Sequence, residues 1–162
     1  MSGFTNQMVR TPNIYSLVKG KGEARMPLNA FDMALLDAGV GDTNLVRMSS
    51  IVPPACKQVK EIVLPKGGLI PIAYAQIGST TPGEIISAAI AVGIPEDDSE
   101  PGVIMEHEDT KPLSYVEATV RQMCVDAFEY RNRKLREVKS LGIEYQVKEC
   151  GAVFAAAVLW YE

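Results

Sequence analysis

The sequence is poor in the side chains that most often activate a nucleophile or hold a metal ion. Its 162 residues include one histidine, His107, and three widely spaced cysteines, Cys56, Cys124 and Cys150, with no CxxC pair. An odd number of isolated cysteines argues against a disulfide framework and a zinc site, so we expect three reduced, structural thiols and no metal. A serine–histidine–aspartate triad would have to use His107, and nothing in the sequence pairs it with a serine. We therefore expect a structural or solvated histidine.

Long apolar runs and phosphate-binding motifs are also missing. No window reaches the ~18 apolar residues that a membrane-spanning helix needs, and residues 1–13 lack the apolar centre of a secretory signal. We therefore expect a cytoplasmic protein without membrane contact. The segments 20–27 and 65–71 contain glycines and lysines, but they have neither the P-loop nor the dinucleotide-binding spacing, so we interpret them as turns.

The charge pattern argues against a nucleic-acid partner. The chain carries a net charge of -4 at pH 7, whereas binding to phosphates calls for a basic surface. The basic run at residues 131–139 has one aromatic neighbour, Tyr130. We interpret this run as a solvated helix face whose cations lie near the helix C-terminus, where the helix dipole favours them.

What the chain does have is enough apolar sequence for one folded domain. Apolar residues make up 47% of the chain, and its length suffices to bury a substantial core. The apolar runs 67–77 and 84–94 are typical of strands buried on both faces, although the second, alanine-rich run could also be helical. Further strands are predicted over 13–23, which leaves through a Gly-Lys-Gly turn, and over 44–52, 103–108, 143–149 and 152–161, with a turn at 39–42 and a solvated loop at 95–102.

Two helices complete the predicted set of elements. The first spans 27–39, with Pro27 in its first turn and a glycine at its end. The second begins at Ser114, whose side chain is expected to form a capping box with Glu117. Apolar residues at helical spacing then continue to Gly142. Several strands and two helices indicate an α+β sandwich.

One short segment, NLVRMSSIVPP, raises a chemical question. It places Ser49 and Ser50 side by side in an apolar run, and we interpret residues 44–52 as one buried strand that the double proline ends. No histidine is near enough in the sequence to make either serine an ordinary nucleophile. Asp32 and Glu106 are carboxylates in apolar surroundings, which makes them candidates for pairing with a ligand or for donating a proton.

Four segments carry a resemblance to a known family. They are PLNAFDMALLDAGVGDTNLVRMSSIVPP, PGEIISAAIAVGIP, GVIMEHE and FAAAVLWY, in that order, and the similarity extends from about Thr11 to Glu162. With these motifs the chain resembles the pyruvoyl-dependent arginine decarboxylases. The resemblance implies a single domain over 1–162, folded as a four-layer α/β/β/α sandwich. It also implies assembly as trimers, or as hexamers of paired trimers, with active sites between neighbouring protomers.

The resemblance implies that the serine pair is a self-cleavage site. The hydroxyl of Ser50 would attack the carbonyl carbon of Ser49 and turn the peptide into an ester. β-Elimination would then leave dehydroalanine, which hydrolyses to a pyruvoyl group. The products would be a β chain of residues 1–49 and an α chain of residues 50–162. Positioning of the nucleophile beside its target can replace a strong base in such a step, and we expect a strained backbone geometry held in part by the prolines.

The resemblance also implies the activity and the residues that carry it. The pyruvoyl group would form a Schiff base with L-arginine and release CO2 and agmatine for polyamine synthesis, without pyridoxal phosphate or a metal. Ser50 would supply the group, Glu106 would donate the proton across a subunit interface, and Asn44 would promote cleavage. Asp32 would bind the substrate guanidinium with two charge-assisted hydrogen bonds. The remaining pocket positions implied by the resemblance are Leu35, Gly41, Thr43 and Ile51.

One residue departs from the family pattern, and two other functions stay open on the sequence alone. His107 stands where the family pattern leads us to expect an aromatic phenol, which leaves the pH optimum open. A pyruvoyl-dependent decarboxylase of another amino acid is one alternative. A non-catalytic trimeric homologue, in which the serines are ordinary strand residues, is the other.

Overall fold

The computed structural model describes residues 9–162, which form nine strands and two helices. In chain order these are β1 (Ile14–Glu23), α1 (Pro27–Asp37), β2 (Asn44–Arg47), β3 (Ile51–Val52), β4 (Lys57–Gln58), β5 (Leu69–Ser79), β6 (Ile85–Pro95), β7 (Gly102–Asp109), α2 (Leu113–Tyr130), β8 (Leu135–Gln146) and β9 (Gly151–Trp160).

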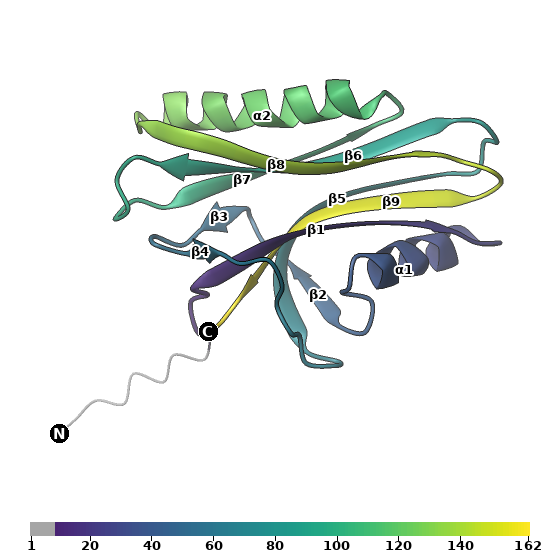
Figure 1. The fold of residues 1–162 in the computed structure, drawn as a ribbon, viewed down its shortest axis with the longest axis horizontal. Helices are drawn as coiled ribbons and strands as arrows, with labels where there is room; N and C mark the ends of the chain where they lie inside the picture. The colour runs from purple at the N-terminus through teal and green to yellow at the C-terminus, as the bar shows by residue number, and fades with distance from the viewer. Residues whose placement is uncertain (1–8) are drawn as a thin grey trace.

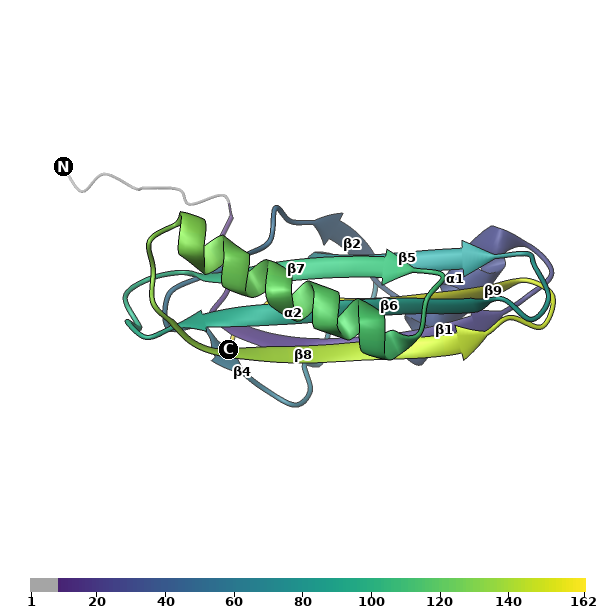
Figure 2. The same ribbon diagram turned by 90° about the horizontal axis from the view of Figure 1, so that it is seen from above.

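The elements form two sheets with one helix on each outer face (Figure 1). One sheet has five strands in the order β2-β5-β9-β1-β4, and the other has four in the order β3-β7-β6-β8. α1 packs on β1 and β9 of the first sheet, while α2 lies along the second sheet over β7, β6 and β8 (Figure 2). The predicted α+β class and the sandwich of two sheets and two helices are therefore confirmed.

The central strands are buried on both faces, which explains why their sequences read as continuous apolar runs. In β9, Ala155 and Ala157 face the core between the sheets, whereas Phe154 and Ala156 face α1. β6 is a strand, not a helix, and nearly all of it is buried. β5 is a strand as predicted, but Gln76 is exposed, so burial on both faces does not extend to its end.

The Gly-Lys-Gly turn predicted at the end of the first strand is wrong. Gly20 and Gly22 are regular residues of β1, which pairs with β9 from Ile14 to Glu23. Their lack of a side chain serves packing, because α1 lies directly on them. A Cβ atom on Gly20 would overlap the carbonyl oxygen of Ala34, and one on Gly22 would lie 2.7 Å from the Ala34 amide nitrogen.

The single strand predicted over residues 44–52 is also wrong. β2 pairs in parallel with β5 in one sheet, and β3 pairs antiparallel with β7 in the other. Since one continuous strand cannot serve both sheets, the chain leaves the first after Arg47 and enters the second at Ile51. The serine pair lies in this crossing.

The second helix is shorter than its apolar pattern predicted. It ends at Tyr130, after which Asn132 adopts a φ of 53° and the chain turns back into β8. Leu135 and Val138 fall at helical spacing by coincidence. They belong to β8 and pack against the apolar face of α2 from the sheet.

The predicted capping box at the start of this helix does not form. Pro112 is the N-cap residue and no side chain of the cap closes the first turn. A carboxylate from β8 does so instead, since Leu113 N donates to Glu144 at 2.7 Å. Glu117 accepts a hydrogen bond from the Ser140 hydroxyl at 2.6 Å and is therefore engaged with the sheet.

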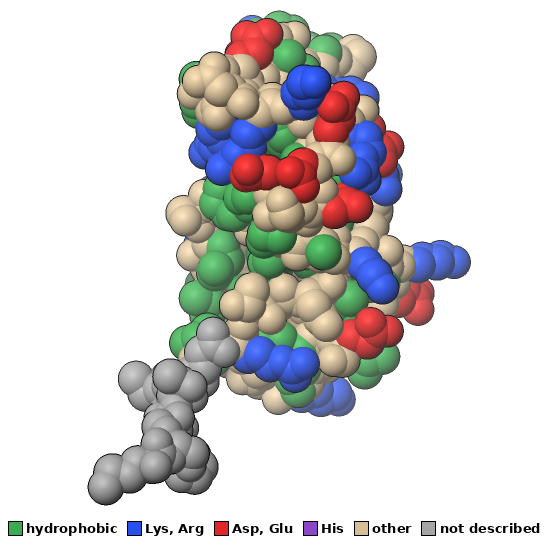
Figure 3. Space-filling view, turned by 90° about the vertical axis from the view of Figure 1, so that its left-hand side faces the viewer, with side chains coloured by type: hydrophobic (Ala, Val, Ile, Leu, Met, Phe, Trp, Pro, Cys, Tyr) green, Lys and Arg blue, Asp and Glu red, His purple; other side chains and the backbone are tan. Residues whose placement is uncertain are grey.

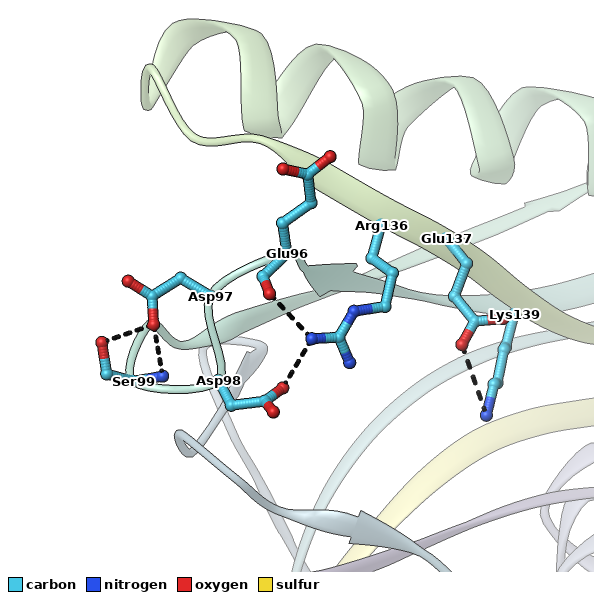
Figure 4. Close-up of polar contacts among 7 residues, drawn as sticks. All are labelled: Glu96, Asp97, Asp98, Ser99, Arg136, Glu137 and Lys139. Carbon is cyan, nitrogen blue, oxygen red and sulfur yellow. Dashed lines mark hydrogen bonds and ion pairs between the residues drawn. The ribbon is translucent and has the colours of Figure 1, made fainter.

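The basic run 131–139 is not a helix face, because most of it lies in the turn after α2 and in β8. Arg133 pairs with Glu100. Figure 4 shows the second pair, in which Arg136 contacts Asp98 of the loop between β6 and β7. Acidic and basic side chains are interspersed over this end of the molecule (Figure 3). Much of the run thus faces solvent, as expected. Its later residues belong to a strand, however, and acidic side chains pair with its cations.

The cysteines and the helices bear on two further expectations from the sequence. All three cysteines are free, with Cys124 and Cys150 buried, and burial raises the pKa of the Cys124 thiol to about 11. Of the helices in residues 9–162, neither is long and apolar enough to cross a membrane.

The close contact of α1 with β1 predicts that Gly20→Ala destabilises the protein by about 1–3 kcal/mol, since the added methyl group meets backbone atoms of α1 that cannot rotate away. The midpoint of thermal unfolding at fixed protein concentration measures the effect. Gly78→Ala in β5 is the control, because its Cβ would lie 3.2 Å from the nearest heavy atom. An equal loss of stability in the two variants would contradict the packing explanation.

Candidate active site

The serine pair lies in a three-residue link that is held at both ends. On one side Met48 N donates to Ile72 O of the five-stranded sheet at 2.8 Å. On the other side Ile104 N of the four-stranded sheet donates to Ser50 O, also at 2.8 Å. The Ser49–Ser50 peptide therefore spans the gap between two fixed points, with Ser49 exposed and Ser50 partly buried.

Ser50 has a strained backbone conformation. Its φ angle is 78°, in the left-handed region that residues other than glycine rarely adopt. A conformation of this kind typically costs ~1–3 kcal/mol and persists only when the surrounding structure imposes it. The strained geometry expected at the serines is present. The double proline lies beyond β3, where Cys56 N donates to Pro53 O in a turn, and not directly beside the serine peptide.

Glu106 lies next to Ser50 in the same chain. β3 and β7 are neighbouring strands, with Ile51 opposite Val103, and this pairing brings the Ser50 hydroxyl to within 3.2 Å of Glu106 Oε2, to which it donates. The expectation that a subunit interface separates this acid from the serine is wrong for this chain, since adjacent strands suffice to bring them together.

The surroundings of Glu106 are polar on the side that faces the serine. Arg47 Nη2 donates to Glu106 Oε1 at 3.1 Å, and this hydrogen bond raises the pKa of the Arg47 guanidinium. Glu106 shares its cavity with Val103, Ile104 and Met105, but its carboxylate is paired with a cation that its sequence neighbours did not predict. Neighbours in sequence point to both faces of a strand, whereas the partner of Glu106 comes from the other sheet.

A cavity of about 270 Å³ opens beside the serines. Its walls come from the serine link, β7 and the end of α2, and two of its lining residues, Glu106 and Arg131, are charged. Its full lining is Ser49, Ser50, Ile51, Val103, Ile104, Met105, Glu106, Met123 and Arg131.

Sequence reasoning missed two arginines of this site. Arg47 lies three residues before Ser50, but it pairs with a carboxylate 59 positions further along the chain, and no local pattern announces such a contact. Arg131 belongs to a basic run that we interpreted as solvated, yet it lines the cavity where α2 ends beside the serines.

Five of the other predicted site residues lie away from this cavity. Asp32 is exposed on α1, and Leu35 follows on the same helix. Asn44 donates from its amide to Gly67 O at 2.9 Å, at the opposite end of β2 from the serines. Two more lie in the turn between α1 and β2, namely Gly41 and Thr43.

Distance along β2 confirms the separation. Asn44 and Arg47 are the two ends of this strand, and three residues of extended chain separate their Cα atoms by about 10 Å. The structure thus brings Ser49, Ser50, Ile51 and Glu106 together, and it places Asp32, Leu35, Gly41, Thr43 and Asn44 on another part of the same chain.

A second cavity, of about 330 Å³, opens between the sheets beside β4 and the start of β8. Tyr15 and Cys56 lie on its wall, and burial raises the pKa of the Tyr15 hydroxyl to about 12. None of the predicted site residues lines it. Within residues 9–162 no group of three His, Cys, Asp or Glu side chains is arranged to hold a metal ion.

Comparisons of this chain with known proteins all lead to the same family. The family model of the pyruvoyl-dependent arginine decarboxylases matches residues 14–162. A protein of that name from Methanocaldococcus jannaschii is 49% identical over 153 residues, which cover 94% of this chain and 93% of the relative. Relatives with the same name from Methanococcus vannielii and Pyrococcus horikoshii are 45% and 39% identical over 153 residues, covering 94% and 93% of this chain and 93% and 96% of the relatives.

Proposed function

The chain belongs to the pyruvoyl-dependent arginine decarboxylase family, and we propose that it converts L-arginine to agmatine and CO2 with a pyruvoyl group made from Ser50. The observation that carries this proposal is the Ser50 hydroxyl, held 3.2 Å from Glu106 on a residue in the left-handed conformation. When present, a pyruvoyl group supplies a ketone that takes up the electrons released as CO2 leaves.

The bonds that change in the cleavage all belong to Ser49 and Ser50 of one chain. The Ser50 oxygen adds to the Ser49 carbonyl carbon and takes over its acyl group from nitrogen. Elimination then removes the Cα proton of residue 50 and breaks its Cβ–Oγ bond, which leaves a carboxylate on Ser49 and dehydroalanine at 50. Addition of water releases ammonia and gives the ketone. The hydrogen bonds that hold Met48 and Ser50 in two different sheets keep the reacting atoms together.

The cleaved chains, residues 1–49 and 50–162 of the single domain, would stay associated. β1 pairs with β9 over its whole length of ten residues, and β2 pairs with β5. Both partner strands belong to the α chain. Separation would therefore strip β1 and β2 from the five-stranded sheet and expose its core.

Glu106 is the residue of this site best placed to handle protons. It touches the position from which the ketone would be made, and it reaches the surface through a side chain that is 22% exposed. We assign it the delivery of a proton to the carbon atom that has lost CO2, a step for which a carboxylic acid in hydrogen-bonding reach is suited.

The rest of the substrate site would come from a neighbouring copy in a trimer. Asp32 can bind a guanidinium through two charge-assisted hydrogen bonds, but it does not line the cavity at its own Ser50. We assign the guanidinium to the neighbour's Asp32. The nearby pocket positions Leu35, Gly41 and Thr43 would be supplied with it, and so would Asn44, as the residue that promotes cleavage.

Exposed apolar side chains beside Asp32 and beside the serines support this assembly. Leu28 and Leu36 lie one turn before and one turn after Asp32 on α1, and they are 77% and 53% exposed. Val46, Met48 and Ile51 are exposed along the free edges of β2 and β3, next to the serines. Exposed apolar residues on an open sheet edge are a liability unless a partner covers them.

The proposed cleavage predicts two chains in the denatured protein, divided between Ser49 and Ser50, with the α chain lacking an amino terminus. Ser50→Ala should remain one chain and have no activity, because the attacking hydroxyl and the precursor of the ketone are both lost. Mass spectrometry of the purified proteins checks both outcomes. An active wild-type protein with a single intact mass would rule out the mechanism.

The role of Glu106 predicts that Glu106→Gln still divides into two chains but decarboxylates on the order of a hundredfold more slowly, because an amide cannot donate the proton. Single-turnover measurements with arginine, on protein whose cleavage has been verified by mass, give the rate. Wild-type turnover in this variant would remove Glu106 as the acid.

The shared site predicts complementation between two defective chains. Asp32→Ala alone should raise KM for arginine about tenfold to a hundredfold through loss of charged hydrogen bonds, and Ser50→Ala alone should be inactive. When the two variants are co-expressed equally and assemble at random, about a quarter of all sites combine an intact Ser50 with a neighbour's intact Asp32.

We expect such mixtures to regain activity with a KM like that of the wild type. If Asp32 served the Ser50 of its own chain, no mixed trimer would contain an intact site, and the mixture would behave like Asp32→Ala diluted with inactive protein.

A further inference from the structure

Arg47, the last residue of β2, is held in one orientation although half of its side chain is exposed. Its Nη2 atom donates to Tyr74 O at 2.9 Å and to Glu106 Oε1 at 3.1 Å. The guanidinium also lies over the ring of Tyr74, with Cζ 4.6 Å from the ring centroid. A backbone carbonyl, an aromatic face and a carboxylate thus fix the plane of the guanidinium.

The two oxygen atoms of Glu106 have different partners. Oε1 accepts from Arg47 and Oε2 accepts from the Ser50 hydroxyl. Rotation of the carboxylate would break both contacts together. Arg47 therefore determines which oxygen faces residue 50 and how far from it that oxygen lies.

We propose that Arg47 is a positioning residue, which aims Glu106 at residue 50 and ties the end of the β chain to the α chain after cleavage. The proposal rests on the proposed function of Ser50 and Glu106. Arg47 lies before the Ser49–Ser50 bond, whereas Tyr74 and Glu106 follow it. Once that bond is broken, these contacts hold the new chain end beside the site.

An arginine suits this position because three contacts must be made at once. The planar guanidinium presents several N–H groups in a fixed fork and can stack on an aromatic ring at the same time. A lysine ammonium is a single point charge on a flexible stem, so it could pair with Glu106 or with Tyr74 O but would not fix the orientation of both.

The test compares Arg47→Gln and Arg47→Lys with the wild type, after cleavage of each has been verified by mass. For Arg47→Gln we expect kcat to fall on the order of a hundredfold, as for a misplaced catalytic group. KM should change by less than about twofold, because Arg47 does not belong to the proposed guanidinium site. Arg47→Lys should restore part of kcat, and it serves as the second variant if the glutamine chain does not cleave.

Hydrogen exchange provides a readout that does not depend on turnover. In the cleaved protein the amides of residues 44–49 should exchange faster in Arg47→Gln than in the wild type, because the end of the β chain has lost its tie to Tyr74 and Glu106. Exchange as slow as in the wild type would overturn the anchoring role.

Arg136→Gln is the matched control (Figure 4). Arg136 Nη2 also donates to a backbone carbonyl, that of Glu96 at 2.7 Å, and to a carboxylate, that of Asp98 at 2.8 Å. Its side chain is 45% exposed, against 53% for Arg47. It lies on β8, at the opposite edge of the sheet from β3 and roughly 14 Å away across three strand spacings. We expect kcat and exchange at 44–49 to be unchanged.

The double variant Arg47→Gln/Glu106→Gln tests whether Arg47 acts through Glu106 or in some other way. We expect it to be no more than about twofold slower than Glu106→Gln, because there is no acid left to position. An Arg47→Gln loss of equal size in both backgrounds would overturn the proposal, and so would a change confined to KM. A wild-type protein that neither divides nor decarboxylates would instead refute the proposed function itself.

Discussion

The crossing of the chain from one sheet to the other at residues 48–50 is the constraint on which the rest of the site depends. β2 has to pair with β5 and β3 with β7, and only three residues join them. Hydrogen bonds on both sides fix the ends of this link and leave Ser50 in the left-handed conformation. Because the two sheets pack on each other and each carries a helix, neither strand can shift to relax the link without disturbing a close-packed core. The whole sandwich therefore maintains the strain at one residue.

The same crossing brings together side chains that neither sheet could assemble alone. Arg47 and Tyr74 come from the five-stranded sheet, Glu106 from the four-stranded sheet, and Ser50 lies between them. In the intact chain the carboxylate of Glu106 accepts a hydrogen bond from the hydroxyl of Ser50, the residue that would react. In the proposed enzyme the same carboxylate lies beside the group made from that residue. One acid can thus stay in contact with position 50 before and after cleavage, without any rearrangement of the strands.

The parts of the fold that were predictable from sequence are those in which burial alone decides the pattern. β6 and β9 are buried on both faces and read as continuous apolar runs. Tertiary contacts determined the rest: Leu135 falls at helical spacing but packs on α2 from β8, and Gly20 was interpreted as a turn residue although it lies in β1 where α1 packs closely on the strand. The resemblance pointed to Ser50 and Glu106, but the partner of Glu106 could not be predicted, because the contact with Arg47 joins two sheets across 59 positions.

The geometry of the single chain links assembly to catalysis in the proposed enzyme. The cavity at the serines, about 270 Å³, falls just below the range of ~300–1,000 Å³ usual for sites that enclose a small ligand. Its one lining carboxylate is already paired with a guanidinium, that of Arg47. A substrate guanidinium would therefore need a second acid, and Asp32 lies on another surface between Leu28 and Leu36. Burial of those exposed leucines against the apolar edge of β2 and β3 would stabilise the assembly and would bring Asp32 to the serines in the same step. In the proposed trimer, burial of these exposed apolar side chains and completion of the active site would thus be one event.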